Sequence, residues 1–313
     1  MKFFQPRLHV VYSYEYFLGL CEKGPRSSFD CNKFRKIRNG LLTKRIIRSR
    51  HIIEPVPAGW EDLSLVHDPE YLEKLKDPAT LASILFLDYV NPFDTDILEF
   101  FMWVTGGTIC TIRQAYDTGN PVFNLGGGFH HAKYDRGEGF CPVNDIAVGI
   151  RRLQQDHPEA RVLVVDLDYH QGNGTGLLFS GDPNVFTYSL HRETWDSIPS
   201  DTNMDVTLPD GTGDGPYMTV LETTLPQVME IFRPELVVYV AGADPHEHDT
   251  LGTFQLTDTG ILTRDRYVWS QCESRGIPLA VVAGGGYGNE SWRLYFNFIR
   301  WAAKGIEDVS HSD

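Results

Sequence analysis

Short apolar segments alternate with segments of helical spacing along most of the chain. Several runs rich in Val, Leu and aromatic residues have the length of buried strands. They cover residues 8–13, 122–125, 162–167, 185–190, 236–242 and 278–284. Apolar residues three and four positions apart predict helices at residues 95–117, 216–232, 257–275 and 289–304. A further helix is expected to begin at Asn144 or Asp145, either of which can cap it, and to end before Pro158.

This alternation predicts an α/β fold in which helices flank both faces of a mainly parallel central sheet. The 313 residues contain no Ser/Gly/Pro-rich linker, repeat or low-complexity run. We therefore expect a single domain over residues 1–313. The N-terminal residues lack the apolar segment of a signal peptide, and no apolar run reaches the length of a membrane span. Because the five cysteines are scattered without paired spacing, a reduced, cytoplasmic protein is the simplest interpretation.

The chain is acidic, with 42 acidic and 28 basic residues and a formal net charge of −14. This excess disfavours direct binding to nucleic acid, which needs a basic surface. It would suit a cationic partner such as a basic peptide or a polyamine, although a negative charge also serves solubility alone.

Polar and glycine-rich sequences follow five of the predicted strands. They are GGGFHH at 126–131, DLDYHQGNG at 166–174, SLH at 189–191, GAD at 242–244 and GGGYG at 284–288. In open parallel sheets, ligands and catalytic groups gather at the C-terminal ends of the strands. The five sequences together therefore predict one convergent site at that edge.

The sequence DLDYH suggests a cation site. In extended chain, successive side chains point to opposite faces, so Asp166, Asp168 and His170 are expected to share one face at the end of the strand. Asp168, His170 and Asp244 offer two carboxylates and one imidazole, which leave a coordination position open as in catalytic zinc sites. Fe(II) and Mn(II) are also compatible with these ligands. Each residue alone could equally cap a helix or lie hydrogen-bonded in the core, so the combination favours a metal.

Other residues of these loops are suited to proton transfer. His130 and His131 could act as base and acid beside a metal-bound water, with Asp166 orienting one ring and Asn173 the other. Tyr287 could donate a hydrogen bond to an oxyanion. Taken alone, the histidines could be a surface pair and the tyrosine could pack on a glycine turn. The loops match neither phosphate-binding glycine motifs nor the GxSxG elbow, and Cys141 is interpreted as structural.

These motifs resemble the histone deacetylase superfamily, which has the arginase-type α/β fold. The resemblance includes VYSYEY, VHDPEYLEKL, GGGFHHA, GEGFCPVNDIA, VDLDYHQGNGT, YSLH, AGADPHEHDTLG and AGGGYG, in order along nearly the whole chain. DLDYHQGNG and DRGEGFC are most similar to the class IV branch. The resemblance implies a zinc-dependent hydrolase that removes acetyl or longer acyl groups from lysine side chains.

The resemblance also assigns residues. It implies that Asp168, His170 and Asp244 bind zinc, that His131 is the general base and that Asp166 pairs with His130. Tyr287 matches the oxyanion-binding tyrosine, and Gly139 and Phe140 match the wall of the acyl-lysine tunnel. A structural potassium ion is expected at Asp166, Ser189 and the main chains of Asp168, His170 and Leu190. A second monovalent cation would use carbonyls near Phe179 and Val185.

Some positions depart from the family pattern. Asn173 stands where class I enzymes have an aspartate, and classes II and IV share this asparagine. Because the asparagine is neutral, it should make His131 a weaker base. RSSFD lacks the histidine and proline common before Phe-Asp, and the aspartate at the tunnel rim could match Asn91 or Asp94. Gly172 and His246 replace the aspartates that hold a second metal in arginase-type sites, so one catalytic metal is expected.

The leading hypothesis is therefore a metal-dependent deacylase of acyl-lysine in proteins or peptides. An acetylpolyamine amidohydrolase is the alternative within the same chemistry, and long fatty-acyl groups are a third substrate option. A non-catalytic acyl-lysine reader is the alternative from another class. The intact set of expected ligands, histidines and tyrosine argues against the reader, because binding alone needs no proton relay.

Overall fold

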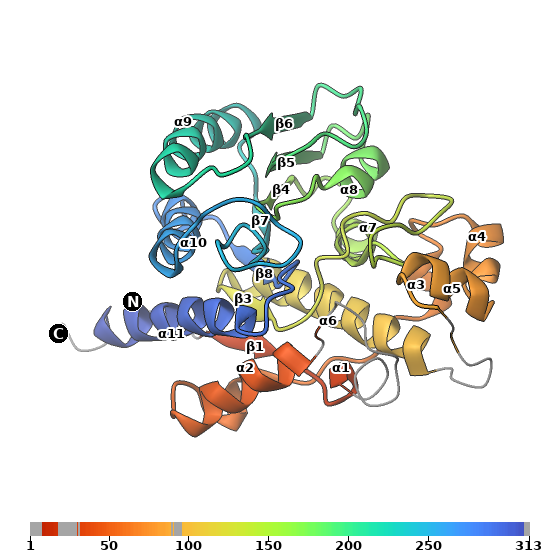
Figure 1. Cartoon of the computed structure of the whole chain (residues 1–313), viewed down its shortest axis with the longest axis horizontal. Coiled ribbons are helices and arrows are strands. Elements are labelled where there is room, and N and C mark those ends of the chain that lie inside the picture. The colour runs from red at the N-terminus through yellow and green to blue at the C-terminus, as the bar shows by residue number, and fades with distance from the viewer. Residues whose placement is uncertain (1–7, 18–29, 31, 89, 91–95, 310–313) are drawn as a thin grey trace.

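The computed structural model describes residues 8–17, 30, 32–88, 90 and 96–309. Its centre is an eight-stranded sheet with the order β2-β1-β3-β8-β7-β4-β5-β6, in which the paired strands are parallel (Figure 1). The strands are β1 (His9–Val11), β2 (Ile52–Ile53), β3 (Val122–Asn124), β4 (Val162–Asp166), β5 (Val185–His191), β6 (Asn203–Thr207), β7 (Leu236–Val240) and β8 (Leu279–Val282). The predicted strands are all present, and the predicted parallel α/β architecture is confirmed.

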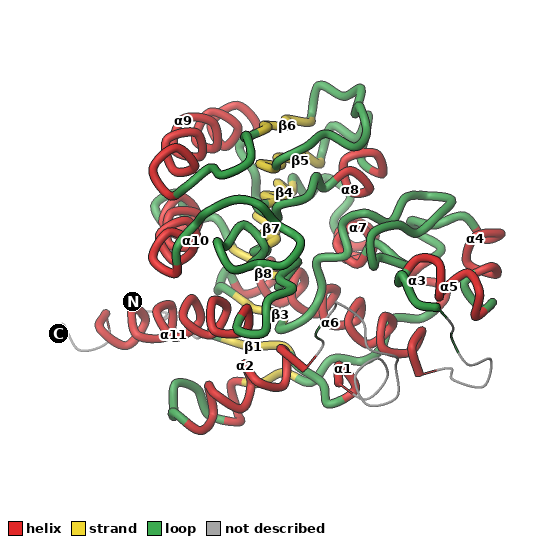
Figure 2. The backbone as a smooth tube through the Cα atoms, in the orientation of Figure 1, coloured by secondary structure: helices red, strands yellow, loops and turns green. Residues whose placement is uncertain are grey.

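Helices surround the sheet. The longer ones are α2 (Asn32–Thr43), α6 (Asp96–Thr118), α7 (Asp145–Asp156), α9 (Asp214–Phe232), α10 (Asp258–Glu273) and α11 (Ser291–Val309). Shorter helices are α1 (Glu15–Phe17), the 3₁₀ helix η2 (Ser49–His51), α3 (Trp60–Leu63), α4 (Pro69–Lys74), α5 (Pro78–Ile84) and α8 (Asn173–Leu178). Helices α9, α10 and α11 lie on one side of the sheet and α6, α7 and α8 on the other (Figures 1 and 2). Among the described helices, none is both long and apolar enough to cross a membrane.

Strand β3 shows how the two faces are covered. The ring of Phe123 packs against Trp269 of α10 and Phe298 of α11. The next side chain, Asn124, points to the opposite face, where its amide donates to the carbonyl of Val104 in α6 at 3.3 Å. This alternation follows from the two-residue period of a strand. It places helices on both faces, as the sequence predicts.

The central strands have no exposed residue. Strands β4, β7 and β8 are buried throughout, consistent with their continuous apolar sequences. Helix α7 begins where expected, because the side chain of Asn144 accepts a hydrogen bond from the main chain of Ala147 at 2.9 Å. The sheet is thus a rigid support for the loops at its C-terminal edge.

Candidate active site

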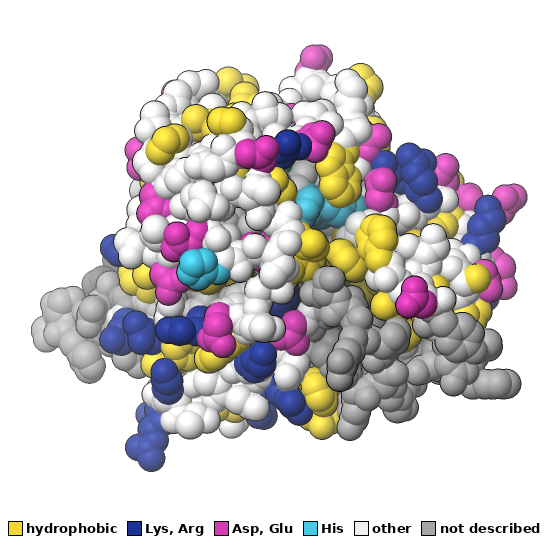
Figure 3. All heavy atoms as spheres, in the orientation of Figure 1, with side chains coloured by type: hydrophobic (Ala, Val, Ile, Leu, Met, Phe, Trp, Pro, Cys, Tyr) yellow, Lys and Arg dark blue, Asp and Glu magenta, His cyan; other side chains and the backbone are white. Residues whose placement is uncertain are grey.

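Loops that follow β3, β4, β7 and β8 meet at the C-terminal edge of the sheet, because these strands are neighbours in the order β3-β8-β7-β4. They enclose a pocket lined by Gly127, Gly128, Phe129, His130, His131, Gly139, Phe140, Cys141, Asp168, Gly284, Gly285 and Tyr287. The surface is hollowed where histidine side chains lie beside hydrophobic ones (Figure 3). Several sequence-predicted residues therefore share one cavity.

Asp168, His170 and Asp244 form a compact cluster of potential ligand atoms. One oxygen or nitrogen of each lies within 4.8 Å of the others. Nδ1 of His170 lies 3.1 Å from Oδ1 of Asp168 and 3.1 Å from Oδ2 of Asp244. The two carboxylates are buried, whereas the imidazole is partly accessible.

The prediction that Asp166, Asp168 and His170 share one face of a strand is wrong. Strand β4 ends at Asp166, and residues 168–170 form a bend instead of a continued strand. Hydrogen bonds from main-chain amides to aspartate side chains shape the bend. The carboxylate of Asp166 accepts from the amide of Asp168 at 3.1 Å, and the carboxylate of Asp168 accepts from the amide of His170 at 3.0 Å. The side chains meet because the chain turns, not because they alternate along one strand.

The residues present fit a divalent cation. Burial and the charge of Asp168 raise the pKa of Asp244, so a cation beside this carboxylate would stabilise its ionised form. A Cβ at Gly285 would lie 2.6 Å from Oδ2 of Asp168, so glycine keeps the space beside the carboxylates open. Two carboxylate oxygens and one imidazole nitrogen are ligands that Zn²⁺ and Fe²⁺ accept.

His130 and His131 have different partners at their Nδ1 atoms. Nδ1 of His130 lies 2.7 Å from Oδ2 of Asp166, and Nδ1 of His131 lies 2.7 Å from Oδ1 of Asn173. Burial lowers the pKa of His130, but the charges of Asp166 and Asp168 outweigh it and raise the pKa to about 9. Burial, together with the neighbouring His130, holds the pKa of His131 well below its usual range. The second imidazole is therefore neutral beside a charged one.

Tyr287 lines the same pocket as Gly139 and Phe140. Burial, with the charges of Asp168 and Asp244, raises the pKa of its phenol well above the usual value, so the hydroxyl stays a proton donor. Its main-chain amide donates to Asp249 at 2.7 Å, which fixes the loop tip. The ring of Phe140 lies 5.8 Å from that of Tyr287.

Gly139 lies at a position that requires glycine. Its φ is +54°, and a Cβ there would overlap the imidazole of His131. Glycine therefore lets the segment pass directly over the ring. Phe140 follows in the same left-handed region, with φ of +66°.

Trp195 belongs to the site although no sequence motif predicts it. Its ring stacks on that of His131, with centroids 4.4 Å apart and an interplanar angle of 12°. It also meets the ring of His170 edge-on at 5.6 Å. Trp195 thus packs against two histidines of the site, from a loop whose sequence contains no recognisable motif.

Two buried cations were also missed. Nζ of Lys33, in α2, donates to the carbonyl of Gly284 at 3.0 Å, and burial lowers its pKa to about 8. Arg264, in α10, donates to the carbonyls of Leu167 and Gly242 at 3.1 Å and 2.8 Å. These carbonyls lie just before the loops that carry Asp168 and Asp244. The sequence does contain a pattern that could have identified them. Helical spacing places Lys33 and Arg264 among the apolar residues on the buried face of each helix.

The expected monovalent-cation residues lie beside the histidine pair. Asp166 and Ser189 are register partners on β4 and β5, and both side chains are buried. The hydroxyl of Ser189 accepts from the amide of Gly172 at 3.2 Å. Leu190 follows in β5 and is buried, while Phe179 and Val185 lie at the end of α8 and the start of β5.

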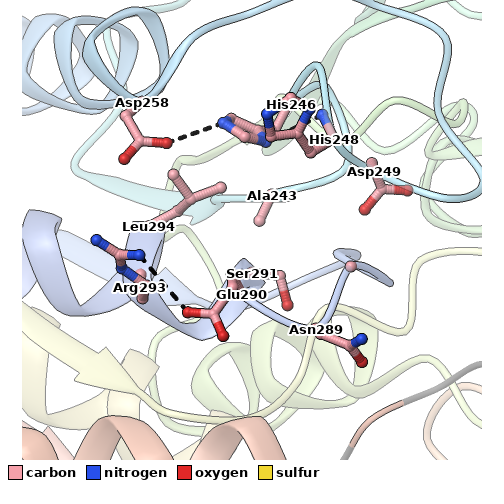
Figure 4. Close-up of a pocket in the computed structure, with 11 residues that line it drawn as sticks. Ala243, His246, His248, Asp249, Asp258, Asn289, Glu290, Ser291, Arg293 and Leu294 are labelled. Carbon is pink, nitrogen blue, oxygen red and sulfur yellow. Dashed lines mark hydrogen bonds and ion pairs between the residues drawn. The ribbon is translucent and has the colours of Figure 1, made fainter.

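The remaining candidates lie elsewhere. Asn91 and Asp94, proposed for the tunnel rim, fall outside the described residues. His246 turns to Asp258, with 2.9 Å between Nε2 and Oδ1, and lines a second pocket that also contains Glu290 and Arg293 (Figure 4). The cluster of three potential ligands does not include His246.

Comparison with known proteins agrees with the geometry. A family model described as the histone deacetylase domain matches residues 28–297. An uncharacterized protein of Picosynechococcus sp. is 36% identical over 281 residues, covering 89% of this chain and 91% of that protein. Histone deacetylase 2 of Arabidopsis thaliana is 32% identical over 302 residues, covering 92% of this chain and 76% of the plant protein.

Solved structures give the same result. The crystal structure of a histone deacetylase homolog from Aquifex aeolicus has a TM-score of 0.80 at 26% sequence identity, covering 96% of this chain and 84% of that chain. A histone deacetylase homolog complexed with SAHA has a TM-score of 0.78 at the same identity and coverage. Because the family model spans most of the sequence and its relatives match most of the chain, the chain belongs to the histone deacetylase family and is a hydrolase of acetylated amides.

Proposed function

We propose that this protein is a zinc-dependent deacylase that removes acetyl or longer acyl groups from lysine side chains. The observation that carries the proposal is the convergence at one edge of the sheet of three potential metal ligands, a histidine pair and a half-buried tyrosine. We place it with the class IV branch on the sequence DLDYHQGNG. We also propose that residues 1–313 form one catalytic domain, since β1 lies inside the same sheet as β8 and α2 packs against α11.

The proposed metal ligands are Asp168, His170 and Asp244. A divalent cation bound there supplies a Lewis acid that polarises the amide carbonyl and lowers the pKa of water. The two carboxylates are buried, which strengthens their electrostatic interactions.

The two histidines have distinct roles in this proposal. The amide oxygen of Asn173 accepts from Nδ1–H of His131, so the lone pair of His131 lies on Nε2. There it accepts from Nε2–H of His130 at 3.2 Å, and in the reaction it takes a proton from the attacking water. His130 is held as an imidazolium by Asp166. One of the two then protonates the departing amine.

Tyr287 stabilises the developing oxyanion. Its hydroxyl remains protonated because its pKa is high, and it lines the same pocket as both histidines. Because the donor is already in place, no reorganisation energy is needed when negative charge develops on the carbonyl oxygen.

The decisive experiment combines metal analysis with an acyl-chain-length series. Purified protein is loaded with Zn²⁺ or Fe²⁺ and assayed on acetyl-lysine peptide, myristoyl-lysine peptide and acetylspermidine, with a hydroxamate as the inhibited control. Hydroxamate-sensitive cleavage of one or both peptides supports the proposal. Cleavage of acetylspermidine alone would make the protein a polyamine deacetylase, and binding of the peptides without cleavage of any substrate would make it a reader.

We further propose a structural potassium ion at Asp166, Ser189 and the main-chain carbonyls of Asp168, His170 and Leu190. The support is the pairing of a buried carboxylate with a buried hydroxyl on adjacent strands. A higher melting temperature in potassium chloride than in tetramethylammonium chloride of equal ionic strength is expected. Equal melting temperatures would contradict this site.

A further inference from the structure

The amide of Asn173 lies between His131 and a carboxylate from a distant loop. Its Oδ1 lies 2.7 Å from Nδ1 of His131, and its Nδ2 donates to Oδ2 of Asp196 at 2.6 Å. A second, longer bond runs from Nδ2 to Glu138 at 3.4 Å. Asn173 itself is completely buried. The second histidine is thus connected to a negative charge through one intervening amide.

An asparagine at this position has an orientation problem that an aspartate does not have. A carboxylate can only accept from the imidazole, whereas an amide can present either its oxygen or its NH₂ group. If the amide of Asn173 rotated by half a turn, NH₂ would face Nδ1 of His131. The imidazole would then carry its proton on Nε2, and the lone pair needed for base catalysis would be lost.

Asp196 removes this ambiguity, because a carboxylate accepts hydrogen bonds and offers none. Burial raises its pKa, but hydrogen bonds from Lys133 and Asn173 outweigh this and lower it, so it remains ionised at neutral pH. NH₂ of Asn173 is therefore held toward Asp196 and the amide oxygen toward His131. In the reversed orientation the amide oxygen would face the carboxylate of Asp196, which places two acceptors against each other.

Lys133 binds the side chain of Asp196, and Gln171 binds its main chain. Nζ of Lys133 lies 2.7 Å from Asp196 and 2.8 Å from Glu138, and the lysine side chain is 7% exposed. The buried amide of Gln171 accepts from the main-chain amides of Trp195 and Asp196 at 2.7 Å and 3.0 Å. Gln171 also donates to the carbonyl of Asp196 at 3.0 Å. The loop is thus fixed by a residue directly after His170.

We propose that Asp196 is a positioning residue for the general base: it orients Asn173 so that His131 keeps its proton on Nδ1 and its lone pair on Nε2. This rests on the proposed function of His131. The same two-residue segment carries Trp195, which stacks on that ring. A simpler role, in which Asp196 only pairs with Lys133, predicts a different response to substitution.

A double-mutant cycle separates these roles. Asp196→Ala is measured in the native background and in Asn173→Asp, where a carboxylate at 173 can only accept from His131. In the native background we expect kcat to fall ~10- to 100-fold, part of what a general base contributes, with KM nearly unchanged. In the Asn173→Asp background the same change should have little effect or raise kcat. Asp201→Ala, on the same loop and exposed, is the matched control.

A second readout does not depend on turnover. In ¹⁵N-histidine-labelled, metal-loaded protein, long-range proton–nitrogen spectra report which ring nitrogen of His131 is protonated. We expect protonated Nδ1 in the native protein and a gain of the Nε2–H form in Asp196→Ala. Equal losses of kcat in both backgrounds with an unchanged tautomer would overturn the proposal. A native protein with the expected tautomer but no deacylase activity would contradict the proposed function alone.

Discussion

Nε2 of His130 lies 3.2 Å from Nε2 of His131. At this separation a charge on one ring strongly disfavours a charge on the other. The carboxylate partner of the first ring and the amide partner of the second decide which ring is charged, since Asp166 stabilises an imidazolium and Asn173 does so less. The two imidazoles are therefore not equivalent, which suits the different roles proposed for them.

Replacing each histidine by alanine should have different consequences. His131→Ala removes the proposed base and should lower kcat by about 10²- to 10⁴-fold. His130→Ala removes the positive charge that lowers the pKa of His131. That pKa should rise, so the acidic limb of the kcat/KM profile should move to higher pH. Profiles of the native protein and His130→Ala between pH 5 and 9 test this, and a limb that moves to lower pH would contradict the assignment.

Tyr287→Phe should retain the metal and lose most of the turnover. The hydroxyl is the only part removed, and loss of one oxyanion donor costs roughly 100-fold or more in kcat. Kinetics are measured beside metal content. Tyr134→Phe is a suitable control because Tyr134 is 56% exposed. Near-native turnover of Tyr287→Phe would exclude the proposed oxyanion role.

Metal removal should destabilise the fold through the proposed ligand cluster. A ligand that binds only the folded state at about 100 times its Kd adds about 2.7 kcal/mol to the free energy of unfolding. Addition of Zn²⁺ to chelator-treated protein should therefore raise the melting temperature of the native chain but not of Asp244→Asn. Asp258→Asn, in the neighbouring pocket, should respond as the native protein does. The same response in Asp244→Asn would argue against the cluster.

Much of the sheet could be predicted because the inner strands are continuous apolar runs. Strand β6, with the sequence NMDVT, was missed since it pairs with β5 alone and its residues are half-buried or exposed. Strand β2 has only two residues, too few for any pattern. An edge strand needs little apolar surface, so the sequence gives no periodic signal for it.

The site was predictable to the extent that its chemistry lies in loops directly after inner strands. His131 and Asp244 stand out because unusual residue types interrupt glycine-rich sequence at those points. Trp195 and Asp196 do not, because they reach His131 and Asn173 only through the folded path of a loop. Their roles depend on tertiary contacts that spacing along the chain does not encode.

Arg264 offers a test of how the loops that carry Asp168 and Asp244 are held. Its guanidinium binds the carbonyls of Leu167 and Gly242 and pairs with Asp265 at 2.8 Å, all in the interior. Arg264→Met leaves that carboxylate uncompensated, so the free energy of unfolding should fall by about 3–5 kcal/mol. Arg264→Met/Asp265→Leu should regain part of the loss. Urea unfolding measures both, and a loss below about 1 kcal/mol in the single variant would contradict this account.

His67 should make the stability depend on pH in a defined window. Its Nδ1–H donates to the carbonyl of Lys133 at 2.8 Å, and its Nε2 accepts from the amide of Asn144 at 3.0 Å. The imidazole is neutral in this arrangement, and burial lowers its pKa to about 4. An unfolded histidine titrates near pH 6.5, so between these values the unfolded chain binds more protons. The contribution of His67 to the free energy of unfolding is therefore fully present above pH 6.5 and is lost as the pH falls toward 4. This loss amounts to about 3 kcal/mol.

His67→Gln keeps one donor and one acceptor but cannot titrate in this range. Urea unfolding of chelator-treated protein at pH 7.5, 6 and 5 should therefore show a weaker pH dependence for this variant than for the native chain. The absolute stability at pH 7.5 is expected to fall as well, because the amide packs differently from the ring, so the slope is the informative quantity. His248→Gln removes an exposed histidine and should leave the slope unchanged. If His67→Gln and the native chain lost stability in parallel between pH 7.5 and 5, the buried neutral imidazole would not be the source of the pH dependence.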